Sequence, residues 1–245
     1  MNSGMYSALS GNIAAMKRMD TISNNLANVN TPGFKKDKMT FEGLITSATT
    51  PPAYPQAKTA DPIMQKETVY IDYATGPVSQ TGNTLDVAID GDGFFAVSTP
   101  SGTAYTRQGN FRLTADGTLV TTDGYPVLGQ GGPISIKGSK VDINAKGEIS
   151  VDGTPAGALN LVDFPKPYKL TKTGSALFVP SGAPAAAPQP AKAEVRQGHL
   201  EGSNVDTVGE MVQMIENNRY FEACQRVILS YDNMATKAAN DLGKL

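Results

Sequence analysis

Residue types that often carry chemistry are scarce in this 245-residue chain, which has one cysteine, one histidine and no tryptophan. A single cysteine, Cys224, excludes an internal disulfide framework. A metal site needs more histidine or cysteine than this, so the sequence predicts no metal and no cofactor. Cys224 and His199 are a weak candidate for a thiol protease pair, because Cys224 lies in an apolar helical pattern that is typical of buried small residues.

The chain also lacks a strong net charge and any long apolar run. The formal net charge is −2, which predicts no nucleic-acid partner. No run of about 18 apolar residues occurs, so we expect no membrane insertion. Near the N-terminus, Lys17 and Arg18 follow spaced apolar residues, the reverse of the order in a secretory signal. We therefore expect a cytoplasmic protein, or one exported by a route that reads no cleavable signal.

No complete catalytic motif is present. Gly-Asp-Gly at 91–93 follows a predicted strand as in a dinucleotide-binding loop, but residues 94–97 form another short β run instead of a helix. Asp90, Asp92 and Asp116 lack the spacing of an EF-hand and are typical of tight turns. A carboxylate pair for glycoside hydrolysis stays open, although no motif marks one. The sequence therefore favours a protein that is not an enzyme.

A helical pattern opens the chain. Its apolar residues recur every three or four positions, which is the spacing of one helix face. These residues are Met5, Leu9, Ile13, Met16, Met19, Ile22 and Leu26. Thr31-Pro32-Gly33 ends the pattern, since proline lacks an amide hydrogen and restricts the residue before it.

A longer helical pattern closes the chain, over residues 206–242. Thr207-x-x-Glu210 has the form of a capping box. Apolar spacings of three and four then alternate as in a heptad seam. The seam comprises Phe221, Cys224, Ile228, Tyr231, Ala235, Ala238 and Leu242, and Val208, Met211, Val212, Met214 and Ile215 continue it upstream. Two such stripes predict that the termini pack together.

The middle of the chain has short alternating runs separated by Asp-Gly turns, the pattern of an antiparallel sheet. We therefore predict an α+β fold. A discontinuous coiled-coil domain is expected from residues 1–34 and 204–245, and an irregular extended arm over 35–66. A mainly antiparallel β domain is inserted over 67–203, with an exposed Pro/Ala loop at 180–194.

Three motifs resemble those of the bacterial flagellar rod and hook family, in family order. They are SNNLANVNTPGFKKD from Ser23, GPVSQTGNTLDVAIDGDGFFAV from Gly76, and LEGSNVDTVGEMVQMIENNRYFEACQRVILSYDNM from Leu200. Within the family the likeness is greatest to proximal rod members, and a distal rod or hook-like subunit is the alternative. Outside the family, the alternatives are a rod-associated cell-wall hydrolase and a carbohydrate-binding β module.

The resemblance implies a structural axial subunit of the basal-body rod, which transmits torque. Such proteins are exported unfolded by the flagellar type III apparatus and assemble in the periplasm as a helical tube lined by their terminal helices. The implied partners are further copies of the chain, the middle and distal rod subunits, and the export apparatus. Phe41 and Ile45 fit a family export-gate motif.

The helical stripes and the SNNLANVNTPGF stretch are the expected assembly surface. Amides of Asn24, Asn25 and Asn28 are expected to bond backbone groups of neighbouring helix ends, so that Asn25→Ala would weaken assembly and spare folding. The other expected interface residues are Leu9, Ile13, Met16, Met19, Leu26, Thr31, Pro32, Gly33, Phe34, Met211, Met214, Ile215, Phe221, Ile228, Tyr231, Ala235, Ala238 and Leu242.

Overall fold

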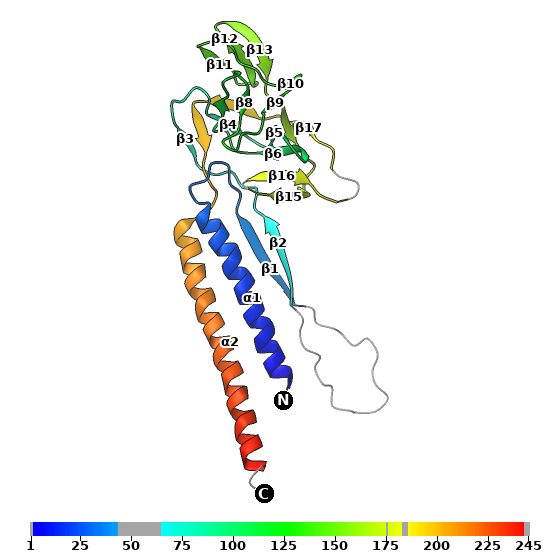
Figure 1. Ribbon diagram of the computed structural model, residues 1–245, viewed down its shortest axis with the longest axis vertical. Helices are drawn as coiled ribbons and strands as arrows, with labels where there is room; N and C mark the ends of the chain where they lie inside the picture. Colours follow the sequence, from blue (N-terminus) through cyan, green and yellow to red (C-terminus); the bar gives the residue numbers. More distant parts are fainter. Residues whose placement is uncertain (1, 44–64, 175, 183–185, 243–245) are drawn as a thin grey trace. The chain divides into compact units, whose positions relative to one another are not determined.

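The computed structural model describes residues 2–43, 65–174, 176–182 and 186–242, and it divides into two compact units (Figure 1). The helix unit comprises Met1–Ala27, Asp37–Asp72 and Asp206–Leu245. The β unit comprises Asn28–Lys36 and Tyr73–Val205. The break at Ala27 divides the SNNLANVNTPGF stretch, so its helical part and its turn belong to different units.

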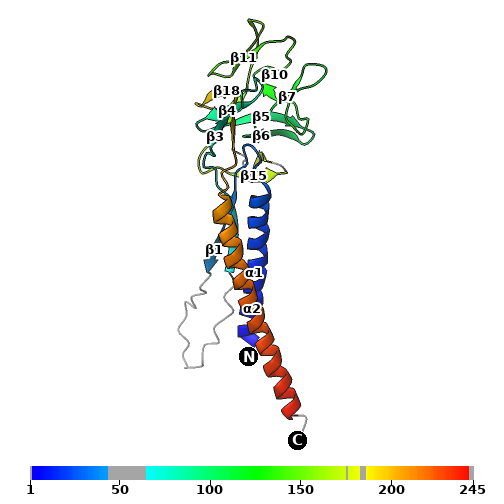
Figure 2. The ribbon, with the colours of Figure 1, turned by 90° about the vertical axis from the view of Figure 1, so that its left-hand side faces the viewer.

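The helix unit contains α1 (Asn2–Ala27) and α2 (Thr207–Leu242), which lie side by side and antiparallel (Figures 1 and 2). The predicted pairing of the terminal helices is therefore confirmed. No helix among the described residues is both long and apolar enough to cross a membrane.

The helix unit also contains a two-stranded antiparallel ladder. Strand β1 (Asp37–Gly43) pairs with β2 (Gln65–Ile71), and Asp37 is opposite Ile71. Residues 37–43 and 65–66 were expected to belong to an irregular arm, and residues 67–71 to the β domain. Residues 38–42, Lys-Met-Thr-Phe-Glu, do alternate between polar and apolar, so the sequence carried a short strand signal that the prediction of an arm passed over.

The β unit is built from short strands, and every named strand pair in its described residues is antiparallel, which confirms the predicted sheet type. Its largest sheet has the order β15-β16-β6-β5-β14-β17. These strands are β5 (Phe94–Thr99), β6 (Gly102–Thr106), β14 (Leu161–Asp163), β15 (Leu170–Thr173), β16 (Leu177–Pro180) and β17 (Gln189–Pro190). Thus part of the expected Pro/Ala loop at 180–194 forms the edge strand β17.

Smaller sheets complete the β unit. One has three strands, β11 (Val141–Ile143), β12 (Glu148–Val151) and β13 (Thr154–Ala158). The two-stranded pairs are β3 (Val78–Gln80) with β19 (His199–Glu201), β4 (Val87–Asp90) with β18 (Glu194–Gln197), β7 (Arg112–Leu113) with β8 (Leu119–Val120), and β9 (Leu128–Gly129) with β10 (Gly132–Pro133).

A continuous apolar core fills the β unit. Val87, Phe95, Leu119 and Val127 are almost fully buried in it, together with residues from most of the small sheets. The predicted Asp-Gly turns lie between its strands. At the turn between β7 and β8, Gly117 has φ +81°, and a Cβ there would lie 2.4 Å from the Ile136 carbonyl oxygen, so only glycine fits.

Candidate assembly surface of the terminal helices

Small residues of α1 form the face that contacts α2. Ala8, Gly11 and Ala15 are buried along this face. A Cβ at Gly4 would lie 2.1 Å from the Tyr231 hydroxyl, and one at Gly11 would lie 3.2 Å from the Cys224 sulfur. The larger side chains of α2 thus occupy the space above glycines of α1, which lets the two helices approach closely.

The contacting face of α2 follows the predicted heptad period. Asn217 and Cys224 are buried on it, while Phe221, Ile228 and Tyr231 are half-buried. The predicted heptad seam is therefore confirmed over 221–231 as the face that packs on α1. Burial raises the pKa of the Tyr220 hydroxyl beside this seam, and the Cys224 thiol raises that pKa further.

The predicted contact face of α1 is wrong over residues 5–16. Met5, Leu9, Ile13 and Met16, named here the α1 patch, are between 38% and 57% exposed. Close approach of two helices favours small side chains between them, so Gly4, Ala8, Gly11 and Ala15 take the seam and the large side chains stay outside. Ile22 is buried, and Met19 and Leu26 are half-buried.

A second apolar surface lies on the first turns of α2. Val208, Met211, Val212 and Ile215, named here the α2 patch, are between 49% and 71% exposed. The sequence pattern placed these residues on the seam that continues from Phe221. In the structure, Met214 lies on the seam as predicted, and Glu210 and Asn217 take the other positions, because these three keep its four- and three-residue spacing.

Asn25 is not available to a neighbouring helix end, which corrects the expectation for this residue. It is 1% exposed, donates to the Asp37 carbonyl oxygen at 2.9 Å and accepts from the Asp37 amide at 3.0 Å. Its amide also lies 3.4 Å from the Glu210 carboxylate. The side chain therefore joins α1, the start of β1 and α2 within one chain.

Two further polar side chains act inside the helix pair. Asn217 donates to the Ala15 carbonyl oxygen at 2.8 Å in a buried position. At the start of α2, Asp206 accepts from the Val208 amide at 3.2 Å, so Asp206 caps the helix in place of the expected capping box at Thr207 and Glu210. The Glu210 carboxylate instead meets Asn25.

The remaining expected interface residues divide between the two units. In the helix unit, Asn24 and Ala235 are exposed and Met214 is half-buried. Ile45 lies outside the described residues, as do the side chains of Phe41, Ala238 and Leu242. The backbone of Phe41 pairs with Glu67 in the ladder of β1 and β2.

In the β unit, the Thr31-Pro32-Gly33 turn is held on the β19 strand. The Gly33 amide donates to the Glu201 carbonyl oxygen at 2.8 Å, and Gly33 has φ +66°. Thr31 donates from its hydroxyl to the half-buried Asn28 at 3.1 Å. Phe34, expected at the assembly interface, is buried beside Ala176 and Val205.

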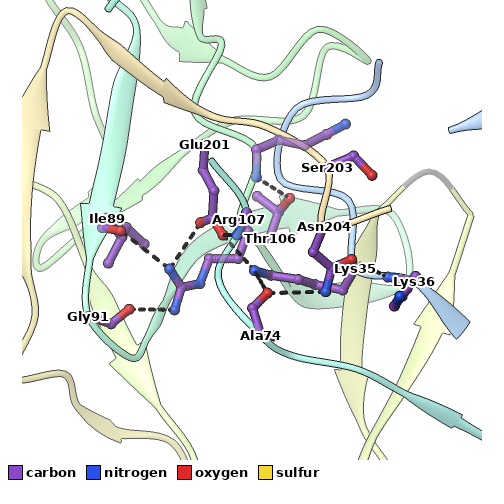
Figure 3. A network of polar contacts seen from close by, with 12 residues as sticks. Lys35, Lys36, Ala74, Ile89, Gly91, Thr106, Arg107, Glu201, Ser203 and Asn204 are labelled. Atoms are coloured by element: carbon purple, nitrogen blue, oxygen red, sulfur yellow. Dashed lines mark hydrogen bonds and ion pairs between the residues drawn. The ribbon is translucent and has the colours of Figure 1, made fainter. Parts of the chain in front are cut away.

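A buried ion network next to this turn was not predicted (Figure 3). Lys35 Nζ lies 2.5 Å from one Glu201 carboxylate oxygen, and Arg107 lies 3.1 Å from the other. Lys35 also donates to the Ala74 carbonyl oxygen at 2.8 Å, and Arg107 donates to that of Gly91 at 2.6 Å. Glu201 is 1% exposed, so its charge depends on these partners.

The described residues contain no group of three or more His, Cys, Asp or Glu side chains that is arranged to hold a metal ion. Cys224 is buried in the helix unit, and His199 belongs to the β unit. The exposed apolar patches of the two helices are the functional candidates.

Comparison with known proteins matches family models to three parts of the chain. The model for the flagella basal body rod protein matches residues 5–35, and that for the D1 domain of flagellar hook protein FlgE/F/G matches 88–151. The C-terminal model of flagellar basal body rod FlgEFG protein matches 196–242. The chain is 37% identical over 261 aligned residues to the flagellar basal-body rod protein FlgG of Bacillus subtilis, covering 96% of this chain and 97% of the relative.

It is also 35% identical to the flagellar basal-body rod protein FlgF of Rhizobium meliloti over 252 residues, covering 99% of each chain. The chain belongs to the flagellar basal-body rod protein family. It is a structural, non-enzymatic subunit of the basal-body rod, and this membership implies assembly with other rod subunits. The FlgF of Mesorhizobium japonicum is similar as well, at 32% identity over 246 residues.

Proposed function

We propose that this rod subunit is of the FlgF type and belongs to the proximal rod. The alignment lengths support this choice. The alignment with Mesorhizobium japonicum FlgF spans 246 residues, almost the 245 of this chain, whereas that with Bacillus subtilis FlgG spans 261 and requires insertions. The 37% identity to FlgG favours the distal rod as the second candidate.

Genetic complementation tests the assignment. The chain, expressed in a strain that lacks proximal FlgF, is expected to restore swimming, and the same plasmid in a strain that lacks FlgG is the matched control. Restoration only in the second strain would assign the chain to the distal rod. Cross-linking to neighbouring rod subunits gives an independent measure of its position.

The observation that carries the assembly mechanism is the exposure of the α1 and α2 patches. The eight large apolar side chains of the two patches remain at the surface after α1 and α2 have paired. Burial of apolar surface contributes about 25 cal/mol per Å². We infer that subunits cover these patches mutually in a helical tube, and that the polar contacts of helix ends set the register.

The proposal includes export of the unfolded chain by the flagellar type III apparatus, followed by folding in the periplasm. The Phe41 to Ile45 segment supports it as the candidate export-gate motif. Phe41→Ala is expected to reduce secretion of the chain into the medium of a hook-less strain. Thr40→Ala, at the preceding position of β1, is the matched control and should leave secretion unchanged.

A further inference from the structure

The buried ion network of the β unit joins segments that are far apart in the sequence (Figure 3). One carboxylate oxygen of Glu201 accepts from Lys35 Nζ at 2.5 Å and from the Gly76 amide at 2.9 Å. The other oxygen accepts from Arg107 at 3.1 Å. All three partners are donors, and an ionised carboxylate accepts on both oxygens, so Glu201 matches them as an anion. These four residues are named here the Glu201 lock.

The chain around Glu201 also completes the β unit. Strand β18 pairs with β4 and places Val195, which is 4% exposed, in the apolar core. Strand β19 pairs with β3, and the Glu201 carbonyl oxygen accepts from the Gly33 amide at 2.8 Å. Residues 194–201 therefore close the unit over strands and a turn that come much earlier in the sequence.

The two cations of the lock precede their counter-charge by a long stretch of chain. Glu201 follows Lys35 by 166 positions and Arg107 by 94. Both cations are almost fully buried in the folded unit, at 1% and 5% exposure. A buried cation that lacks its counter-charge is strongly unfavourable, whereas the same cation in water is solvated. A chain made only as far as residue 200 therefore meets this cost if it folds its β unit.

We propose that Glu201 is a closing residue, which delays folding of the β unit until nearly the whole chain has been made. Synthesis runs from the N-terminus, and Glu201 lies in the last fifth of the 245 residues. Until Glu201 is available, the charges of Lys35 and Arg107 keep their segments in water. The device holds the growing chain unfolded, which is the form that the proposed export route accepts. This inference rests on that proposed function and names the residues that delay folding.

Loop-closure entropy acts in the same direction. The contact between Lys35 and Glu201 brings together the ends of a long loop, so it gains little until the chain between them is ordered. Strands β11, β12 and β13, by contrast, all form from the single short stretch 141–158. In the complete chain we therefore expect the lock to form after the rate-limiting step of folding.

Cell-free synthesis of the full chain tests the delay. Samples taken during synthesis receive a brief protease pulse, and antibodies to the β unit detect resistant fragments. In the wild-type chain, resistance is expected only after the complete chain has left the ribosome. The matched control, named here the apolar variant, carries Lys35→Met, Arg107→Met and Glu201→Leu, because apolar replacement of a buried ion triad often preserves folding. Ribosome-bound chains of this variant are expected to become resistant.

The apolar variant separates the effect of the charges from that of the strands. It retains β18 and β19, so equal timing in the two chains would assign the delay to these strands and overturn the role of Glu201. Resistant wild-type chains on the ribosome would overturn it as well. In cells, secretion of the apolar variant is expected to fall about fivefold, because a chain that folds early is lost to export. Equal secretion of a variant that folds early would overturn the link to export.

Folding kinetics of the purified chain decide the question where the apolar variant does not fold. Arg107→Lys keeps the charge but loses the fork that bonds both Glu201 and the Gly91 carbonyl oxygen. With a late lock, this change should raise the unfolding rate about fivefold and alter the refolding rate by less than about twofold. Asp142→Asn, at an exposed ion pair, is the control and should alter neither rate.

A refolding rate of Arg107→Lys that falls as much as the stability would show an early lock and overturn the proposal. Failure of the proposed function is a separate result. A wild-type chain that flagellated cells do not secrete would reject the proposed export, whatever the timing of folding.

Discussion

The helix unit and the β unit bury different kinds of side chain. The β unit buries a continuous core of Phe, Val, Ile and Leu, with one ion network centred on Glu201. The helix unit buries glycine, alanine and amides between its helices and leaves most large apolar side chains exposed. We infer that the β unit is stabilised mainly by its own chain, whereas the helix unit gains much of its apolar burial from neighbouring subunits.

The largest effect on the β unit is expected from Glu201→Gln. This change leaves Lys35 and Arg107 buried without a counter-charge, which costs about 3–5 kcal/mol. Asp142→Asn, which breaks the exposed pair with Lys140, is the control and should cost less than about 1 kcal/mol. Urea unfolding, monitored by tyrosine fluorescence, measures the free energy of unfolding of both variants. Equal losses in the two variants would reject the role of the network.

Gly33→Ala should be the next most severe change. Alanine is strained at φ +66°, and its Cβ would lie 2.4 Å from the Arg107 carbonyl carbon. Gly82→Ala separates the backbone strain from the steric overlap, because Gly82 has φ +74° but no atom lies within 4 Å of a Cβ built there. We expect thermal unfolding to show a loss of stability of about 1–3 kcal/mol for the control, Gly82→Ala, and a larger loss for Gly33→Ala.

Asn25→Ala tests the polar contacts of the helix unit. Loss of the side chain leaves Asp37 and Glu210 without its bonds, and we expect a cost of about 1–3 kcal/mol. Hydrogen exchange should show faster exchange of the Asp37 amide in the isolated chain. Asn218→Ala, at an exposed site of α2, is the control. An unchanged exchange rate of the Asp37 amide in Asn25→Ala would contradict the role assigned to Asn25.

Leu9→Ser should have the smallest effect on the isolated chain and a large effect on assembly. Leu9 is 45% exposed, so its loss should change the free energy of unfolding by less than about 0.5 kcal/mol. Swimming should nevertheless fall strongly. Ala8→Ser, on the adjacent buried face, is the control with the opposite pattern. It should measurably lower the stability of the helix unit in the isolated chain.

Sequence periodicity predicted both helices and the contact face of α2 over 221–231, because spacing alone determines which residues share a face. It misplaced the residues of the α2 patch, which it put on the same seam. It failed on α1, where large apolar residues were taken as the seam. The repeat of Gly4, Ala8, Gly11 and Ala15 was the signal that could have found the true face. The same pattern could not show that Asn25 is buried, since its partners come from β1 and α2.

The ion network could not be predicted from the sequence. Lys35 and Glu201 are 166 positions apart in the sequence. Each is a charged residue of a type that usually lies on the surface, and only the folded structure shows that both are buried. The β1 strand was missed although residues 38–42 alternate, since its pairing with β2 depends on residues beyond a long connection. Such features depend on tertiary contacts, which local patterns do not encode.

Methionine oxidation tests most directly the claim that neighbouring subunits cover the helix patches. Met16 and Met211, at 57% and 49% exposure, are probes for the two patches. Mass spectrometry after brief peroxide treatment compares the isolated chain with purified basal bodies. We predict rapid oxidation of both residues in the isolated chain and at least tenfold protection in the rod. Equal oxidation rates in the two states would contradict the account.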